Sequence, residues 1–150
     1  MDFTDPGHDV VGLIQRHDNL MILRTLSKGY SLAGLRLGYG IGPSALIEPI
    51  ARKTRDSYSV DAVADALGAA ALADQPAAQA SWEAVREERT RVIDALRGRG
   101  FAIPDSQANF CLARVPNRAG RSAEALYRGL KDSGILVRHF ATPRLADCLR

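Results

Sequence analysis

A lysine, two hydroxyl residues and an arginine occupy one short stretch of the chain. Thr25 and Ser27 stand just before Lys28, and Arg36 follows eight residues after the lysine. A lysine amine that is partly desolvated and near a fixed positive charge has a lowered pKa and becomes a nucleophile. Hydroxyl groups and a guanidinium fork together bind a phosphate dianion. This spacing therefore predicts an imine-forming amine beside a phosphate site.

The same residue types also have ordinary explanations. A lysine in a surface loop is commonly a solvated charge, and serine or threonine near the end of a strand is commonly a turn residue. The functional alternative has one specific chemistry behind it, because an imine-forming lysine beside a phosphate cup is what a pyridoxal 5′-phosphate enzyme needs.

The elements predicted around this stretch favour an α/β fold. The apolar residues 20–23 predict a buried strand, and residues 24–30 predict a loop at its carboxyl end, where ligands sit in open α/β sheets. Residues 36–41 predict a second strand, and a helix is expected from Pro43 or Ser44 to about Arg52. A buried strand of this kind is typical of an all-parallel sheet, which needs neighbours on both sides.

Two helices and a small lobe are predicted downstream. The alanine-rich residues 60–73 form one helix, and an apolar face that includes Trp82 and Ile93 predicts a longer one that ends near Gly98. Strands over residues 109–115 and 135–140, with a helix over 122–131 between them, predict a β-α-β lobe. We expect three segments: the end of a large domain at 1–58, bridging helices at 59–99 and part of a small domain at 100–150.

Composition narrows the class of protein. The 150 residues are 46% hydrophobic and 25% charged, which is typical of a globular protein. The 20 basic and 17 acidic residues are interleaved, which disfavours a nucleic-acid stripe. No apolar run reaches the roughly 20 residues of a membrane span, and no signal peptide opens the chain. We therefore expect a cytoplasmic protein with neither nucleic-acid nor membrane partners, whose residues 1–9 are solvent-exposed.

The cysteines and histidines give no sign of a metal site. Cys111 and Cys148 lack CxxC spacing and are expected to be reduced, buried thiols. His8, His17 and His139 are far apart in the sequence, have no metal-ligand spacing and are expected to be solvated.

The residues around Lys28 resemble the lysine segment of the fold-type-I, pyridoxal-phosphate-dependent aminotransferases of classes I and II, above all the histidinol-phosphate aminotransferases. The signature NL…LRTLSK-x-x-x-LAGLR-x-GY stands here as Asn19-Leu20 and residues 23–39. Weaker likenesses follow in family order at residues 107–110, 134–138 and 148–150. The resemblance implies a partial PLP-transferase fold: the end of the large domain, bridging helices and a small C-terminal α/β lobe.

The resemblance also implies roles for individual residues. Lys28 would hold the cofactor and then move a proton between the substrate α-carbon and the C4′ atom of the cofactor. Thr25, Ser27 and Arg36 would bind the cofactor phosphate. Arg150 would grip the substrate α-carboxylate in a bidentate pair, and Arg138 would lie near the phosphate end of the substrate.

Two further positions stay open. Asn109 either supports the small lobe or is an ordinary hydrogen-bonding residue at a strand end. Tyr58 lies in residues 57–61, where the family has a PYN-x-N-like turn that this chain does not reproduce.

The implied parent protein is a cytoplasmic, homodimeric aminotransferase. It would exchange an amino group between histidinol phosphate, or a similar amino acid, and 2-oxoglutarate in histidine biosynthesis. A decarboxylase acting on a phosphorylated amino acid and an aromatic aminotransferase share the lysine motif and stay as alternatives.

The resemblance further implies that parts of the site lie outside the chain. The family's DEAY strand, which carries the aspartate for the pyridine nitrogen, would precede Met1, and the last predicted strand stops at Arg150. We expect a fragment truncated at both ends and inactive by itself. The alternative from another class is a catalytically inactive remnant or a binding module that docks on a full-length partner.

Overall fold

The computed structural model describes residues 2–5, 7–54, 60–116 and 122–150. The chain divides into two compact units, Met1–Ala84 and Val85–Arg150, and the division falls within the long helix α3 (Gln75–Arg97). Across the described ranges, no helix combines the length and the apolar character needed to cross a membrane.

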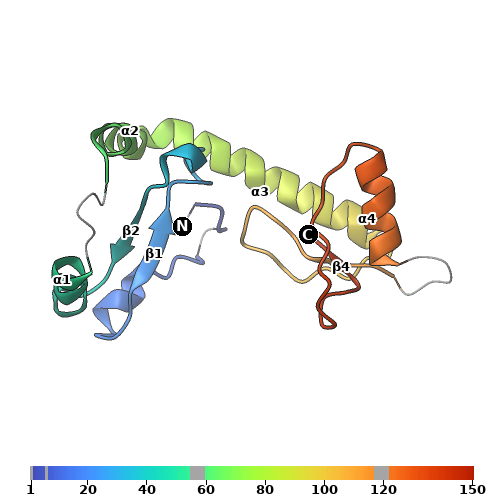
Figure 1. The fold of residues 1–150 in the computed structure, drawn as a ribbon, viewed down its shortest axis with the longest axis horizontal. Coiled ribbons are helices and arrows are strands. Elements are labelled where there is room, and N and C mark those ends of the chain that lie inside the picture. The colour runs from blue at the N-terminus through green and yellow to red at the C-terminus, as the bar shows by residue number, and fades with distance from the viewer. Residues whose placement is uncertain (1, 6, 55–59, 117–121) are drawn as a thin grey trace. The chain divides into compact units, whose positions relative to one another are not determined.

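The first unit is built on a pair of short strands. Strand β1 (Ile22–Thr25) and strand β2 (Gly38–Ile41) lie side by side (Figure 1) and pair antiparallel, with Thr25 opposite Gly38 in the register. The strands approach closely at Gly38, where an added Cβ would lie 2.5 Å from the carbonyl oxygen of Arg24. The other elements of this unit, besides the first part of α3, are η1 (Val11–Gln15), η2 (Ala33–Leu35), α1 (Ser44–Lys53) and α2 (Ala62–Ala73).

The predicted strands need correction, whereas the predicted helices are confirmed. The first strand begins at Ile22, and it is antiparallel to its partner, not part of a parallel pair. It is not fully buried either, because alternate side chains of a strand point to opposite faces and Leu23 is 73% exposed. The second strand starts at Gly38 because Arg36, at φ 52°, has a left-handed backbone that a strand does not accommodate.

Helix α2 packs against the segment that joins the two strands. Leu26 is only 1% exposed, and an added Cβ on Gly68 would collide with Leu37 and touch Leu26. The helix begins after Asp61, whose carboxylate accepts the backbone N–H groups of Val63 and Ala64 at 2.9 and 2.8 Å. Such an N-cap satisfies donors that the first helical turn leaves without partners. The cap fixes where α2 begins, and the close approach at Gly68 holds the helix against Leu26, the residue before Ser27.

The second unit has a small two-part core. Strand β3 (Ala113–Arg114) pairs antiparallel with β4 (Cys148–Leu149), and helix α4 (Ala123–Asp132) begins after the N-cap Ser122. Two clusters of buried residues form the core of this unit. One contains Ile93, Ile103 and Ala113, the other contains Val115, Ala123 and Leu149, and Phe101 packs against both. Both cysteines are free thiols and Cys148 is buried, as expected, but Cys111 is only half-buried. Burial is the main cause that raises the pKa of the Cys148 thiol.

Two predicted strands of this unit are largely absent. Residues 109–115 contain only the two-residue β3, and residues 135–140 contain only an isolated bridge between His139 and Leu149. Ile135 and Leu136, which the prediction placed in a strand, are 54% and 81% exposed. Alternating apolar residues do not make a strand without a hydrogen-bonded partner alongside, so the pattern overestimated both elements.

Candidate active site

Lys28 lies on the turn that follows β1, as the sequence predicts. The turn is anchored by Leu26, which is buried, while the side chains of Thr25 and Lys28 are exposed. Two backbone hydrogen bonds fix Leu26: its N–H donates to Leu37 O at 3.0 Å, and its carbonyl accepts from Leu32 N at 3.1 Å. One buried leucine therefore holds the loop in the core and turns its neighbours outward.

The two hydroxyl residues of this turn contact one another. Thr25 Oγ1 lies 2.9 Å from Ser27 Oγ and 3.4 Å from Leu37 O, and it accepts the N–H of Ser27 at 3.1 Å. The hydroxyl groups are thus fixed side by side in the residues immediately before Lys28. Two adjacent hydroxyl donors are suited to the oxygens of one phosphate group.

Arg36 lies at the other end of the same loop. It caps the short helix η2 in a left-handed conformation, and its Nη1 donates to Ala33 O at 3.0 Å. The next residue, Leu37, bonds to Leu26 and Thr25 through its carbonyl, so Arg36 adjoins the hydroxyl pair in the backbone network. The structure thus places Thr25 at the end of β1 and Ser27, Lys28 and Arg36 in the loop that joins β1 to β2, and Arg36 stands two residues before the strand it was expected to open.

Gly29 is held from two sides, which the sequence did not suggest. The indole Nε1 of Trp82, on α3, donates to Gly29 O at 2.6 Å. On the other side an added Cβ would collide with the carboxylate of Asp2. Trp82 was predicted to be a core residue, but it is half-buried and serves the loop. The available signal was its N–H, because a partly buried indole usually finds an acceptor.

Asp2 also corrects the expectation that residues 1–9 are solvent-exposed. Its carboxylate forms an ion pair with Arg24, and the two side chains are only 12% and 14% exposed. Within the described part of this segment, residues 7–10 are exposed and residues 2–5 are half-buried. The arginine that attracts Asp2 is adjacent to Thr25, so the beginning of the chain packs against the lysine loop.

The second unit brings Arg138 and Arg150 together. Each backbone N–H donates to the carbonyl of the other at 2.9 Å, so the two residues lie directly opposite one another. Their guanidinium groups lie over aromatic rings, Arg138 over Phe140 at 5.2 Å and Arg150 over Phe110 at 5.0 Å from the ring centre. Like charges directly opposite are unfavourable. Two exposed guanidinium groups in this arrangement are suited to an anionic ligand.

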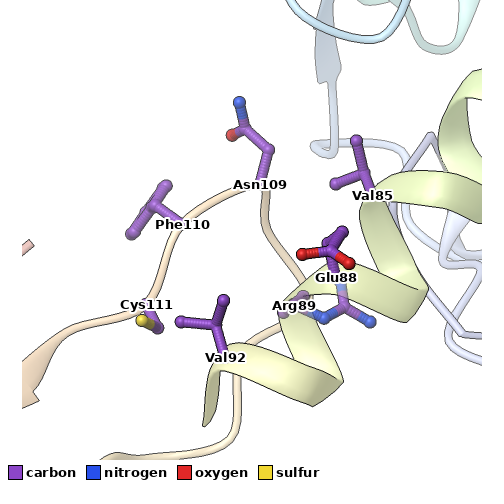
Figure 2. Close-up of a pocket in the computed structure, with 7 residues that line it drawn as sticks. All are labelled: Val85, Glu88, Arg89, Val92, Asn109, Phe110 and Cys111. Carbon is purple, nitrogen blue, oxygen red and sulfur yellow. The ribbon is translucent and has the colours of Figure 1, made fainter. Parts of the chain in front are cut away.

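A cavity of about 240 Å³ lies beside Phe110 in the same unit. In Figure 2 the loop that carries Asn109, Phe110 and Cys111 runs beside helix α3. The lining residues from the helix are Val85, Glu88, Arg89 and Val92. Arg89 Nη1 donates to Ala108 O at 3.3 Å and ties the loop to the helix. Asn109 is exposed at this cavity, and its role stays a prediction.

Tyr58 and the three histidines are the remaining residues that the sequence analysis considered. Tyr58 lies outside the described residues. His8 and His17 are exposed as expected, but His139 is half-buried, with its Nε2 3.0 Å from Ala146 O. Among the residues that the structure describes, no three or more His, Cys, Asp or Glu side chains are grouped to hold a metal ion.

The comparisons with known proteins give the class. Residues 2–150 match the family model "Aminotransferase class I and II". The chain belongs to this family of aminotransferases.

Within the family, the chain is similar to histidinol-phosphate aminotransferases. It is 45% identical, over all of its 150 residues, to the histidinol-phosphate aminotransferase of Microcystis aeruginosa, of which it covers 41%. Its fold matches the crystal structure of the histidinol-phosphate aminotransferase from Clostridium acetobutylicum with a TM-score of 0.84 and 29% identity, covering 99% of this chain and 45% of that one. A second match is the enzyme from Sinorhizobium meliloti in complex with pyridoxal-5′-phosphate, with a TM-score of 0.72 and 28% identity, covering 89% of this chain and 36% of that one.

The chain spans about 41% of the length of the curated relatives it matches. Over this part, the chain has the mixed helix and sheet fold of the solved aminotransferases that it matches.

Proposed function

We propose that this chain supplies the cofactor-holding lysine and the substrate arginines of a pyridoxal 5′-phosphate-dependent aminotransferase. The observation that carries the proposal is the position of Lys28, exposed on a fixed turn directly after two contacting hydroxyl groups. The curated relatives named histidinol-phosphate aminotransferase support transfer of an amino group between histidinol phosphate, or a similar amino acid, and 2-oxoglutarate, in histidine biosynthesis.

The residues of the lysine loop fit the cofactor in their chemistry. Thr25 and Ser27 offer hydroxyl donors, and Arg36 offers a guanidinium charge for a phosphate dianion. When bound, pyridoxal phosphate supplies a reactive carbonyl and an electron-withdrawing ring. The Lys28 amine holds the cofactor covalently and, once released, moves the proton at the substrate α-carbon. Arg150 orients the substrate through its α-carboxylate, and Arg138 binds the anionic end of its side chain.

The assembly and location belong to the same proposal. The resemblance to fold-type-I aminotransferases supports a homodimer that works in the cytoplasm on small-molecule amino acids and 2-oxo acids. Sedimentation of the complete protein at two concentrations tests the dimer, and a monomer at both would contradict it.

Borohydride trapping tests the role of Lys28. The complete protein is mixed with pyridoxal phosphate and reduced, and the modified lysines are identified by peptide mass spectrometry. We expect labelling of Lys28 well above that of Lys53 and Lys131, which are the remaining lysines of the chain. Equal labelling of all three would contradict the proposal and favour an inactive remnant or a binding module.

Turnover assays then separate the enzyme classes. Histidinol phosphate and 2-oxoglutarate should give glutamate, and Lys28→Ala should abolish its formation while Lys53→Ala leaves it unchanged. Release of carbon dioxide without consumption of 2-oxoglutarate would instead indicate the related decarboxylase. A preference for phenylalanine or tyrosine as amino donor would indicate an aromatic aminotransferase.

A further inference from the structure

Trp82 makes a polar contact to the lysine loop that neither the family match nor the chemistry proposed above uses. Its indole N–H donates to Gly29 O at 2.6 Å, and its ring meets the ring of Tyr30 edge-on, with centroids 5.5 Å apart and an interplanar angle of 89°. The two residues that follow Lys28 are therefore both held by one side chain. All of these residues lie in the unit Met1–Ala84.

The turn around Lys28 has hydrogen bonds on both sides of the lysine, and one of its residues has an unfavourable backbone conformation. On the N-terminal side Leu26 is buried and Ser27 N bonds to Thr25 Oγ1 at 3.1 Å. On the C-terminal side the turn is closed by the bonds from Ser31 N to Lys28 O at 3.2 Å and from Leu32 N to Leu26 O at 3.1 Å. Ser31 has a left-handed backbone, with φ 56°, which is unfavourable for a residue with a side chain. A turn with this geometry needs outside contacts to stay in one conformation.

Gly29 is where those outside contacts are made. It is buried, its α-carbon faces the carboxylate of Asp2, and its carbonyl accepts from Trp82. Removing the donor of a buried acceptor costs more free energy than removing the donor of an exposed one, because water cannot easily replace the lost hydrogen bond. Loss of the indole N–H would therefore favour rotation of the Gly29–Tyr30 peptide, which carries this carbonyl, away from its present orientation.

We propose that Trp82 is a positioning residue for Lys28, acting through the Gly29 carbonyl to hold the lysine turn in the conformation that directs the amine toward the cofactor. This inference rests on the proposed function of Lys28. It assigns Trp82 no contact with cofactor or substrate. Its effect is on the orientation of the amine, so it should change the rate of reaction at Lys28 more than the binding of substrates.

The test removes the N–H and keeps the shape. Trp82 is replaced by benzothienylalanine, in which sulfur takes the place of the N–H, and in a parallel variant by phenylalanine. Tyr30→Phe is the matched control, because it keeps the ring against Trp82 and removes only the hydroxyl that lies 3.3 Å from Gln75 Nε2. Measurements use the complete protein at a temperature where every variant is fully folded.

Three readings are expected from the benzothienylalanine variant. The amides of Ser31 and Leu32, which close the turn, should exchange with solvent about threefold to tenfold faster, the equivalent of one hydrogen bond. The rate of borohydride trapping at Lys28 should fall on the order of tenfold, as should kcat, with KM within about twofold of the original. Trapping at Lys53 and Lys131 should not change, and Tyr30→Phe should behave as the original protein.

The outcomes distinguish the inference from the function it rests on. Unchanged amide exchange and unchanged trapping at Lys28 in the benzothienylalanine variant would overturn the role of Trp82. A parallel change of labelling at all three lysines would also overturn it, because the cause would then not be specific to the lysine turn. If the original protein itself shows no preference for Lys28, the proposed function fails, and amide exchange at Ser31 and Leu32 still decides whether Trp82 holds the turn.

Discussion

In the unit Met1–Ala84, Lys28 projects from a turn that is held by hydrogen bonds to its backbone, whereas in the unit Val85–Arg150 the side chains of Arg138 and Arg150 lie over aromatic rings. The first arrangement fixes the chain and leaves the side chain exposed. The second fixes the guanidinium groups themselves. The difference suits the proposed chemistry, because an amine that moves a proton needs freedom of its side chain and an anion-binding pair needs a stable direction.

From this comparison we expect the largest loss of stability from a substitution that crowds the backbone of the first unit. Gly38→Val places a branched side chain where a Cβ would already lie 2.5 Å from Arg24 O, so the pairing of β1 with β2 must open. We expect a loss of about 3 kcal/mol in the free energy of unfolding, measured by chemical denaturation. Gly12→Ala is the control, since nothing lies within 4 Å of its added Cβ. A Gly38→Val protein as stable as this control would contradict the prediction.

A smaller effect is expected where the crowding atom belongs to a side chain. Gly29→Ala collides with Asp2, which is held by its ion pair with Arg24. We expect a loss of about 1–3 kcal/mol in the free energy of unfolding. In an Asp2→Gly background the same substitution should cost clearly less, because the obstacle has been removed. Equal costs in both backgrounds would show that Asp2 is not what excludes a side chain at Gly29.

The smallest effect is expected at the aromatic supports of the second unit. Phe110→Leu removes the ring beneath Arg150 and keeps an apolar side chain, and it should cost about 0.5–1 kcal/mol in anion binding. Binding of a phosphate-bearing substrate analogue, followed by calorimetry, measures this loss. Phe140→Leu gives the matching value for Arg138. Losses above tenfold in affinity would mean that the rings do more than support the guanidinium groups.

The two units also differ in how far the sequence predicts them. Around Lys28, the loop after a strand and the helices α1 and α2 follow from short-range patterns, and the predicted placement of the lysine after a strand is confirmed, whereas the burial of Leu26 within that loop was not predicted. In the second unit the alternating residues 109–115 and 135–140 predicted strands that are mostly absent. Alternation reports only which residues are apolar, whereas a strand also depends on a partner elsewhere in the chain.

The contacts that the sequence could not predict are those between distant residues. Trp82 reaches Gly29 across 53 positions, and Asp2 reaches Arg24 across 22. A half-buried indole predicts that an acceptor exists and does not say which one. The left-handed backbone of Arg36 was equally hidden, because arginine rarely adopts it.

Trp82 is the sole tryptophan of the chain, and it lies against Gly29. Indole emission from this chain therefore comes entirely from one place, the neighbourhood of Lys28. Its intensity and wavelength depend on the hydrogen bond and on water at that place, so the emission is an optical reporter of the lysine turn. An absorbing group attached at Lys28 would quench it, whereas the same group on a distant lysine would leave more of the emission intact.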